Sequence, residues 1–479
     1  MSLAFILFPL AMAALAASAP LGRRRPLLLP FTGLVHAAMT VAVLLRPDLG
    51  EGVRWLVLDA PGRLVLLLVS ILFLLISWFS VGYLAYRAER PNRVFCACLS
   101  AFLGFMSLVI WAHHLGLMWV GIEATTLATA PLIYFNSNQR SLEATWKYLL
   151  VGSVGIALAL LGTFFLAYAA IQQGLASSLT FEDLLIQAPR LSKPWLHAAF
   201  ILMLVGYGTK MGLAPMHTWK PDAYGEAPSI VGAILAGGVT TVAFTAILRV
   251  RAVVGAAGEG AIADRTLLVI GLFSMLVAAL FLLGTPDFKR MLAYSSVEHM
   301  GILCVGAALG GVGVAAALFH VWTNGLTKGA LFLSAGNIRR AAGSASMNDV
   351  RGMSLLTPRS AAIFVTGMFA VTALPPFGPF FSELQVVRAA LASGQGAATA
   401  IFLGGLLLAF FGLTRVVFGI TDGRPRPTTR LNARRFVETA GVIVPPLVLL
   451  GLSLWLGLFT PPILRDVWSA AVAQLFPTP

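Results

Sequence analysis

The sequence is dominated by long runs of apolar residues, each about as long as a helix that crosses a bilayer. Of its 479 residues, 58% are apolar and 11% are charged, whereas an ordinary soluble domain carries about 25% charged residues. So few charges cannot cover the surface of a soluble protein of this size. The composition therefore excludes a cytosolic enzyme, a disordered protein and a disulfide scaffold, and it predicts a polytopic helical membrane protein.

Fourteen of these runs are candidates for membrane spans, since a spanning helix needs about 20 apolar residues. They lie at residues 2–20, 27–45, 64–86, 94–112, 115–135, 148–172, 196–217, 227–248, 266–285, 291–310, 313–335, 359–392, 397–419 and 437–460. The run 359–392 is too long for one straight helix, and Pro375, Pro376 and Gly378 within it predict a broken helix. We expect an all-α integral membrane protein with about 14 transmembrane helices.

The distribution of lysine and arginine predicts how the spans are oriented. A net charge of +14 would suit nucleic acid, but membrane proteins concentrate these residues in cytoplasmic loops, so we expect no nucleic-acid partner. Loops counted from an outside N-terminus place 20 of the 33 cationic residues inside and 9 outside. Lys220 and Lys289 count as inside residues, and Arg249 and Arg251 as outside residues. The arginines at 23–25 follow the first span, which is typical of a spanning helix rather than a cleaved signal. We expect a multi-pass protein of the bacterial inner membrane with both termini in the periplasm.

A single membrane domain with two related halves is the expected organisation. The stretches GTKMGLAPMHTW and TALPPFGPFFSEL, roughly 170 residues apart, each combine a buried charge with a proline-containing break. Paired broken helices indicate inverted repeats with a site near the midplane. We expect three N-terminal helices in residues 1–93, one five-helix repeat in 94–251, a second in 266–420, and a last helix at 437–460.

Several charged side chains fall inside the apolar runs. Lys210 and Lys328 lie too far from the span ends to reach the interface easily, and Glu123 and Glu383 are also within spans. A charge at the bilayer centre costs about 2.5–3.5 kcal/mol on insertion scales, so each one needs a partner or a wet cavity. Glu123 and Lys210 have opposite charges and could pair. A lysine held in such a balance can load and release a proton as its partner moves. The alternative is a static ion pair that fixes helix packing.

A second polar group lies on one helix face. His320, Asn324 and Lys328 follow one another at intervals of four residues, so they share a side of the helix. This spacing predicts a wet stripe or a proton path, and interhelical hydrogen bonding is the alternative. Glu298 and His299 are either part of the same relay or an interfacial pair at a helix end.

Motifs for redox centres and nucleotides are missing from the sequence. The cysteines, Cys96, Cys98 and Cys304, form no CxxC pair, so an iron–sulfur cluster or structural zinc has too few ligands. The sequence has no P-loop and no dinucleotide-binding glycine motif after a strand. We therefore expect no cofactor, no metal and no catalytic redox centre in this chain.

The segments around the buried charges form a recognisable set. They read YGTKMGLAPMHTWKPDAYGEAPS, DFKRMLAYSSVEHMGIL, LFHVWTNGLTKGALFLSAG and LPPFGPFFSEL. This set resembles the antiporter-like membrane subunits of respiratory complex I, Mrp antiporters and membrane-bound hydrogenases. The resemblance covers spans four to thirteen. LGLMWVGIEATTLATAPLIYF and WKYLLVGSVGIALALLGT are most similar to component F of hydrogenase-4 and formate hydrogenlyase-type complexes.

The resemblance implies roles for individual residues in proton translocation. Glu123 matches a fifth-helix glutamate that modulates a central lysine, and Lys210 matches that lysine on the broken seventh helix. Lys328 and His320 match the lysine and histidine of the eleventh helix. The two remaining matches are His299 on the tenth helix and Glu383 on the twelfth.

One position departs from the pattern of the family. Many members carry a lysine or histidine midway along the eighth helix, and this chain has Thr241 there, beside Thr240. A hydroxyl holds water but does not titrate at working pH. The path either runs through ordered water at these threonines or is interrupted.

The expected function is that of a non-redox membrane subunit of an energy-converting oxidoreductase complex. The resemblance implies proton translocation driven by redox chemistry in separate peripheral subunits that hold nickel–iron or flavin and iron–sulfur centres, next to other membrane subunits and lipid. One alternative is a cation/proton antiporter subunit of Mrp type. A second alternative is a scaffold subunit that does not pump, because its eighth-helix base is missing.

Overall fold

Helices account for all the regular structure that the computed structural model describes, which covers residues 1–50, 52–433 and 436–476. Pairing of extended backbone in these residues is limited to three isolated bridges between loops. The first helices are α1 (Ser2–Ser18), α2 (Leu28–Leu45), α3 (Ala60–Tyr86), α4 (Arg93–Trp111), α5 (Leu115–Ile133), α6 (Gln139–Ile171), α7 (Phe181–Gln187), α8 (Lys193–Met211), α9 (Trp219–Glu226), α10 (Ser229–Ile234) and α11 (Thr240–Ala256). The later helices are α12 (Gly260–Gly284), α13 (Phe288–Ala307), α14 (Gly310–Ala342), α15 (Met353–Leu356), α16 (Pro358–Val371), α17 (Gly378–Ala392), α18 (Gly396–Thr421), α19 (Pro427–Ala433), α20 (Ala440–Leu458) and α21 (Pro462–Leu475).

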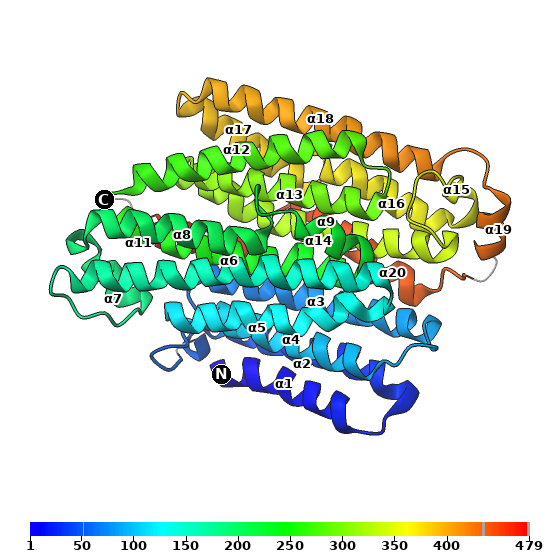
Figure 1. Ribbon diagram of the computed structural model, residues 1–479, viewed down its shortest axis with the longest axis horizontal. Coiled ribbons are helices and arrows are strands. Elements are labelled where there is room, and N and C mark those ends of the chain that lie inside the picture. The colour runs from blue at the N-terminus through cyan, green and yellow to red at the C-terminus, as the bar shows by residue number, and fades with distance from the viewer. Residues whose placement is uncertain (51, 434–435, 477–479) are drawn as a thin grey trace.

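The long helices run side by side along the longest axis of the molecule, from α1 at one edge to α18 at the other (Figure 1). The short helix α7 lies at one end of this bundle, and α15 and α19 lie at the opposite end. Helix α14 is buried along most of its length, because it packs against α10, α13, α16, α17 and α20. The central part of α14 is therefore surrounded by protein.

The expected spans coincide with helices throughout the chain. Each of the 14 lies on a helix or on a helix with a break. Within the described residues, 9 helices are long and apolar enough to cross a membrane by length and composition alone. The all-α membrane architecture is thus confirmed, whereas the number of crossings stays a prediction.

Both expected helix breaks are present, and the local sequence explains each of them. Helix α8 stops before Gly212, which adopts a left-handed conformation with φ of 81°, and Pro215 lies in the gap before α9. Helix α16 ends shortly before Ala373, whose φ is 54°, and Pro375 and Pro376 fill the gap before α17. The breaks leave backbone carbonyls without helical partners inside the bundle.

The eighth expected span contains a wide helical turn. A π-helical segment, η5 (Leu235–Val239), joins α10 to α11. Short π segments of this kind interrupt regular helices frequently at functional sites. Beyond it, α11 continues to Ala256, further than the apolar run 227–248 predicted.

Helix α21 is a part of the fold that the sequence analysis did not anticipate. It follows the last expected span and, with 14 residues, is too short to cross a bilayer. Its Trp468 ring packs 5.4 Å from the Phe319 ring and 5.9 Å from the Trp322 ring of α14, measured between ring centroids. The Gln474 side chain accepts a hydrogen bond from the Ala60 amide at 3.0 Å. The C-terminal helix thus ties α3 to α14.

Candidate functional site

The first part of the site is the pair formed by Glu123 on α5 and Lys210 in the last turn of α8. Lys210 Nζ lies 3.8 Å from Glu123 Oε2, and the lysine side chain is 1% exposed whereas the glutamate is 22% exposed. Lys210 Nζ also donates to Thr126 Oγ1 at 2.5 Å and lies 5.5 Å from the centre of the Tyr148 ring. Ser153 donates to Glu123 Oε1 at 3.2 Å. The expected pair is therefore present, and its separation is longer than that of a direct charged hydrogen bond.

A glycine makes room for the ammonium group of Lys210. A Cβ atom on Gly152 of α6 would lie 2.7 Å from Lys210 Nζ. Any larger residue there would push against the charged group itself. The sequence WKYLLVGSVG thus places a glycine where α6 passes the lysine.

The broken end of α8 is capped by two side chains from α9. The Trp219 indole donates to the Thr209 carbonyl at 2.9 Å, and Lys220 Nζ donates to the Met211 carbonyl at 2.5 Å. The bond from Lys220 satisfies a carbonyl that the helix break leaves free, and the bond from Trp219 adds to the one that the Thr209 carbonyl accepts from the Gly212 amide. Lys220 is 0% exposed, so the structure places it inside the bundle and not in an inside loop, as charge counting had placed it. The free Met211 carbonyl stabilises this buried position of the lysine. The sequence alone does not show that this carbonyl is free.

Lys220 connects the first part of the site to the second. Helix α9 packs against both α6 and α13, and α13 carries Ser295 and His299 of the second part. Lys220 itself contacts the residue after Lys210. Lys220 therefore lies between the two expected halves of the path, although its sequence gave no signal beyond a lysine after a tryptophan.

The second part of the site lies between α13, α14 and α17. Lys328 Nζ donates to Ser295 Oγ at 2.6 Å. About two turns further along α14, His320 Nε2 and His299 Nδ1 are 2.9 Å apart, and His320 Nδ1 is 2.8 Å from Ser382 Oγ. All these side chains are buried. His320 and Lys328 thus share a face of α14, as their spacing predicted, and this face is turned towards α13.

Glu383 ends this row of polar groups. It follows Ser382 on α17 and is 3% exposed, and neither of its carboxyl oxygens has a hydrogen-bond partner among the described residues. His299 Nε2 and Asn324 Oδ1 are likewise buried without a hydrogen bond in the part of the chain that the structure covers. Unpaired polar atoms in such a place are typical of a site that water or a moving proton serves.

The same groups have the composition of a metal site. His299, His320 and Glu383 bring one ligand atom each to within 4.8 Å of the others, and two histidines with one glutamate can hold zinc. Two of the nitrogen atoms are already joined in the bond between the histidines. The sequence analysis expected no metal in this chain, and that expectation stays a prediction.

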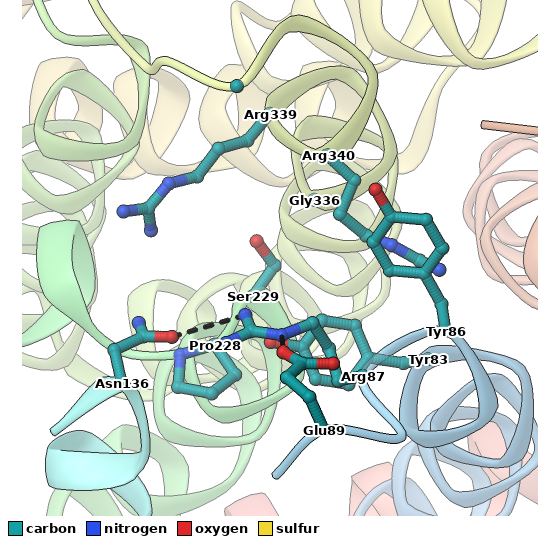
Figure 2. A pocket seen from close by; sticks show the side chains of 11 residues that line it. Tyr83, Tyr86, Arg87, Glu89, Asn136, Pro228, Ser229, Gly336, Arg339 and Arg340 are labelled. Carbon is teal, nitrogen blue, oxygen red and sulfur yellow. Dashed lines mark hydrogen bonds and ion pairs between the residues drawn. The ribbon is translucent and has the colours of Figure 1, made fainter. Parts of the chain in front are cut away.

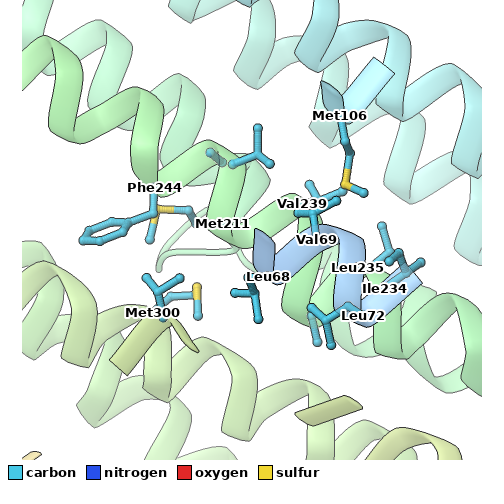
Figure 3. Packing of buried hydrophobic residues seen from close by; sticks show 14 of the residues in the cluster. Leu68, Val69, Leu72, Met106, Met211, Ile234, Leu235, Val239, Phe244 and Met300 are labelled. Atoms are coloured by element: carbon cyan, nitrogen blue, oxygen red, sulfur yellow. The ribbon is translucent and has the colours of Figure 1, made fainter. Parts of the chain in front are cut away.

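Thr240 and Thr241 of the eighth span have no free hydroxyl proton to donate between the two parts. Thr241 Oγ1 donates to the Gly237 carbonyl at 2.8 Å, and Thr240 Oγ1 donates to the Ala236 carbonyl at 2.6 Å. Both hydroxyl protons are therefore used within the helix. Figure 3 shows the apolar side chains that pack around this segment, among them Leu68, Leu72, Met106, Met211, Leu235, Val239, Phe244 and Met300.

Two arginines assigned to outside loops are also buried, on α11. Arg249 donates to both carboxyl oxygens of Asp59, at 2.9 and 2.7 Å, and to the Ile110 carbonyl at 2.9 Å. Arg251 donates to both oxygens of Asp264, at 2.9 and 2.8 Å. Lys289, counted with the inside loops, is fully buried and donates to backbone carbonyls of the α9–α10 connection. These three cations thus lie on helices and not in loops, because carboxylates and backbone carbonyls of other segments hold their side chains. The side of the membrane that charge counting gave them stays a prediction.

Replacing Arg249 with methionine is expected to destabilise the fold strongly. The variant leaves the Asp59 carboxylate, which is 7% exposed, without its guanidinium partner, and breaking a buried pair in this way costs about 3–5 kcal/mol. Thermal unfolding of the purified protein in detergent measures the loss. The matched control is Arg46→Met, at an exposed arginine whose loss should cost less than about 1 kcal/mol. Equal destabilisation by both changes would contradict this assignment.

Comparisons with known proteins agree with the resemblance. A family model described as NADH:quinone oxidoreductase/Mrp antiporter, TM, matches residues 112–409. The chain is 36% identical over 420 residues to a hydrogenase-4 component F homolog of Methylacidiphilum infernorum (isolate V4), which covers 81% of this chain and 87% of that relative. It is 31% identical over 484 residues to NADH-quinone oxidoreductase subunit N of Desulforudis audaxviator (strain MP104C), covering 94% of each.

A solved structure shares the whole fold. A chain in the structure of the Mrp complex from Dietzia sp. DQ12-45-1b superposes with a TM-score of 0.87 and 22% sequence identity, covering 99% of this chain and 97% of that one. At this identity the likeness concerns the fold alone.

Proposed function

Since this chain belongs to the NADH:quinone oxidoreductase/Mrp antiporter transmembrane family, we propose that it translocates protons as a membrane subunit of a redox-driven, energy-converting complex of hydrogenase-4 type. The observation that carries this proposal is the buried row of titratable side chains. It begins at Glu123 and Lys210, continues through Lys220 and Lys328, and ends at the His299, His320 and Glu383 group. Apolar helices surround this row, so charge has few other places to move.

The pair of Glu123 and Lys210 is the point at which the driving force acts. Redox chemistry in a neighbouring subunit moves charge towards Glu123, which is the more exposed partner. The two side chains separate, and the ammonium of Lys210 loses the charge that favours its protonated form. Moving one charge against 100 mV costs about 2.3 kcal/mol, so the redox event has to change the free energy of protonation by a comparable amount.

Lys220 supplies the link that the eighth span lacks. The hydroxyls of Thr240 and Thr241 already donate within their own helix, and the packing around them is apolar. Lys220 has no acidic partner at hydrogen-bond distance among the described residues; its ammonium contacts a backbone carbonyl. A proton released from Lys210 therefore passes to Lys220 and on to Lys328 by way of water. His299, His320 and Glu383 form the last section of this route.

The electron-transfer chemistry belongs to other subunits. We infer that nickel–iron or flavin and iron–sulfur centres lie in peripheral subunits beside this chain, in the inner membrane of a bacterium, with both termini in the periplasm. The two five-helix segments 94–251 and 266–420 act as inverted repeats; the first contributes Lys210 and Lys220 to the path and the second contributes Lys328. The fold shared with a chain of the Mrp complex is also compatible with the alternative function, that of a cation/proton antiporter subunit.

Affinity purification in mild detergent followed by mass spectrometry is the experiment that tests the assignment to a redox complex. We expect nickel–iron hydrogenase or formate dehydrogenase subunits to co-purify with the tagged chain. Flavin and NADH-binding subunits in their place would move the chain to a complex of NADH:quinone oxidoreductase type. Recovery with small membrane proteins and without any redox subunit would overturn the proposal in favour of the antiporter.

A further inference from the structure

A cavity of about 450 Å³ lies at the end of the bundle where α3 and α14 terminate and α10 begins. Its wall includes Arg87, Glu89, Asn136, Ser229, Arg339 and Arg340 (Figure 2). None of these residues belongs to the row of titratable groups described above. By the distribution of cationic loops, this end of the bundle is the cytoplasmic one.

Positive charge dominates the cavity. Arg87, Arg339 and Arg340 line it, and Glu89 is the only acid among its described lining residues. Arg87 Nε donates to Glu89 Oε1 at 2.5 Å. Burial raises the pKa of Glu89. The hydrogen bond from Arg87 and the charges of Arg87 and Arg90 lower it by more, so its pKa lies below the usual value. Glu89 is thus ionised and committed to Arg87, which leaves the other two guanidinium groups without an acid.

The guanidinium of Arg340 is held in place by aromatic rings. Its central carbon lies 4.1 Å from the centre of the Tyr86 ring, 5.2 Å from Tyr83 and 5.1 Å from Phe436. Arg340 Nε and Nη1 are buried and have no hydrogen-bond partner in the described part of the chain. Leaving buried charged donors unpaired is costly. The rings therefore fix the group in a position where an acceptor is missing.

Arg339 is the second cation of the cavity that has no acidic partner among the described residues. It donates to the Gly225 carbonyl at 3.2 Å, which is the long end of the range for such bonds. In Figure 2 its side chain reaches from α14 across the cavity towards Asn136, while Arg340 turns to Tyr86. The two guanidinium groups thus point to opposite sides of the view, with the Ser229 side chain between and below them.

We propose that this cavity binds a phosphate group, presented either by the headgroup of an anionic phospholipid or as a free anion. Planar guanidinium groups match phosphate oxygens with paired hydrogen bonds. Basic pockets between spans on the cytoplasmic side are suited to anionic headgroups. The volume is within the range of small-molecule sites of about 300–1,000 Å³, so it accommodates a phosphate together with part of its glycerol.

Binding to the purified complex tests the proposal. The complex is stripped of lipid, and its melting temperature is followed while phosphatidylglycerol, phosphatidylcholine or inorganic phosphate is added, since a ligand of the folded state raises that temperature. We expect phosphatidylglycerol to stabilise more than phosphatidylcholine. A shift with inorganic phosphate that also competes with the lipid would support the same chemistry with a free anion as ligand. No effect of inorganic phosphate assigns the site to the headgroup.

Variants connect the effect to this cavity. Arg339→Gln and Arg340→Gln should each weaken phosphatidylglycerol binding roughly fivefold, because one basic residue near a lipid surface contributes about this factor. Arg339→Gln leaves the aromatic stack around Arg340 intact, so it remains informative if the other variant fails to fold. Arg426→Gln, at an exposed arginine, is the matched control. Equal stabilisation by both lipids, or unchanged affinity in Arg339→Gln, would overturn the proposal.

Discussion

Replacing Lys210 with alanine is expected to stop redox-coupled proton transport through this subunit while the complex still assembles and transfers electrons. Lys210 is the titratable group that contacts Glu123, and its other neighbours, Thr126 and Tyr148, do not take up and release protons at working pH. Without a positioned acid or base, proton transfer slows by about a hundredfold or more. The measurement is the pH change in proteoliposomes or inverted vesicles, divided by the rate of electron transfer.

Lys147→Ala is the matched control for this variant. Lys147 is 47% exposed and pairs with Glu143 and Asp222 at the start of α6. Its loss removes the same charge and side chain from a solvated position, so transport per electron should stay within about twofold, as exposed ion pairs contribute little. Normal coupled transport in assembled Lys210→Ala complex would contradict the proposed path and favour the scaffold alternative.

Replacing Lys220 with arginine is the second change for which we expect a large loss of coupled proton transport. Lysine can release its proton, whereas arginine cannot. Arginine keeps the positive charge and the donors that cap the Met211 carbonyl. We expect Lys220→Arg to assemble and to lose coupled transport to about the same extent as Lys210→Ala. If Lys220 only caps α8, the arginine variant will transport protons at the rate of the unmodified complex.

A rescue variant protects this test against a simple packing defect. A Cβ atom on Gly212 would lie 2.6 Å from Lys220 Cδ, so the larger arginine side chain has little space. Lys220→Met has a similar length and no charge, and it should also lose transport. Adding Thr241→Lys to Lys220→Met restores a titratable group between the two halves and should recover part of the transport. Thr241→Lys alone is the control, and failure of the double variant to exceed Lys220→Met would count against a bridging role.

The sequence was sufficient for the architecture and for the ends of the candidate site. Runs of apolar residues located the spans, and charges within them singled out Glu123, Lys210, Lys328 and Glu383, because a buried charge is too costly to retain without a reason. The opposite signs of Glu123 and Lys210 predicted their contact, which the structure places at 3.8 Å. The function of these residues stays a prediction until the variants are measured.

Contacts between distant segments were beyond the reach of the sequence. Lys220 and Arg249 both lie near the ends of apolar runs, where loop residues are the usual interpretation. Their burial depends on the free carbonyl of Met211 and on Asp59, and neither partner is visible in the local pattern. The contact between His299 and His320 likewise depends on how α13 and α14 pack. Removing the buried cations from the loop count leaves the inside excess in the same direction.

The ion pair of Arg249 and Asp59 has a consequence for biogenesis. Its partners are separated by 190 residues, so a nascent chain carries the aspartate long before the arginine has been synthesised. At translation rates of about 5–20 residues per second, the interval is about 10–40 s. During that time the Asp59 carboxylate caps the first turn of α3 through the Gly62 amide, but it lacks the guanidinium that stabilises it in a buried position. The N-terminal helices thus reach their final positions only after the ribosome has synthesised α11.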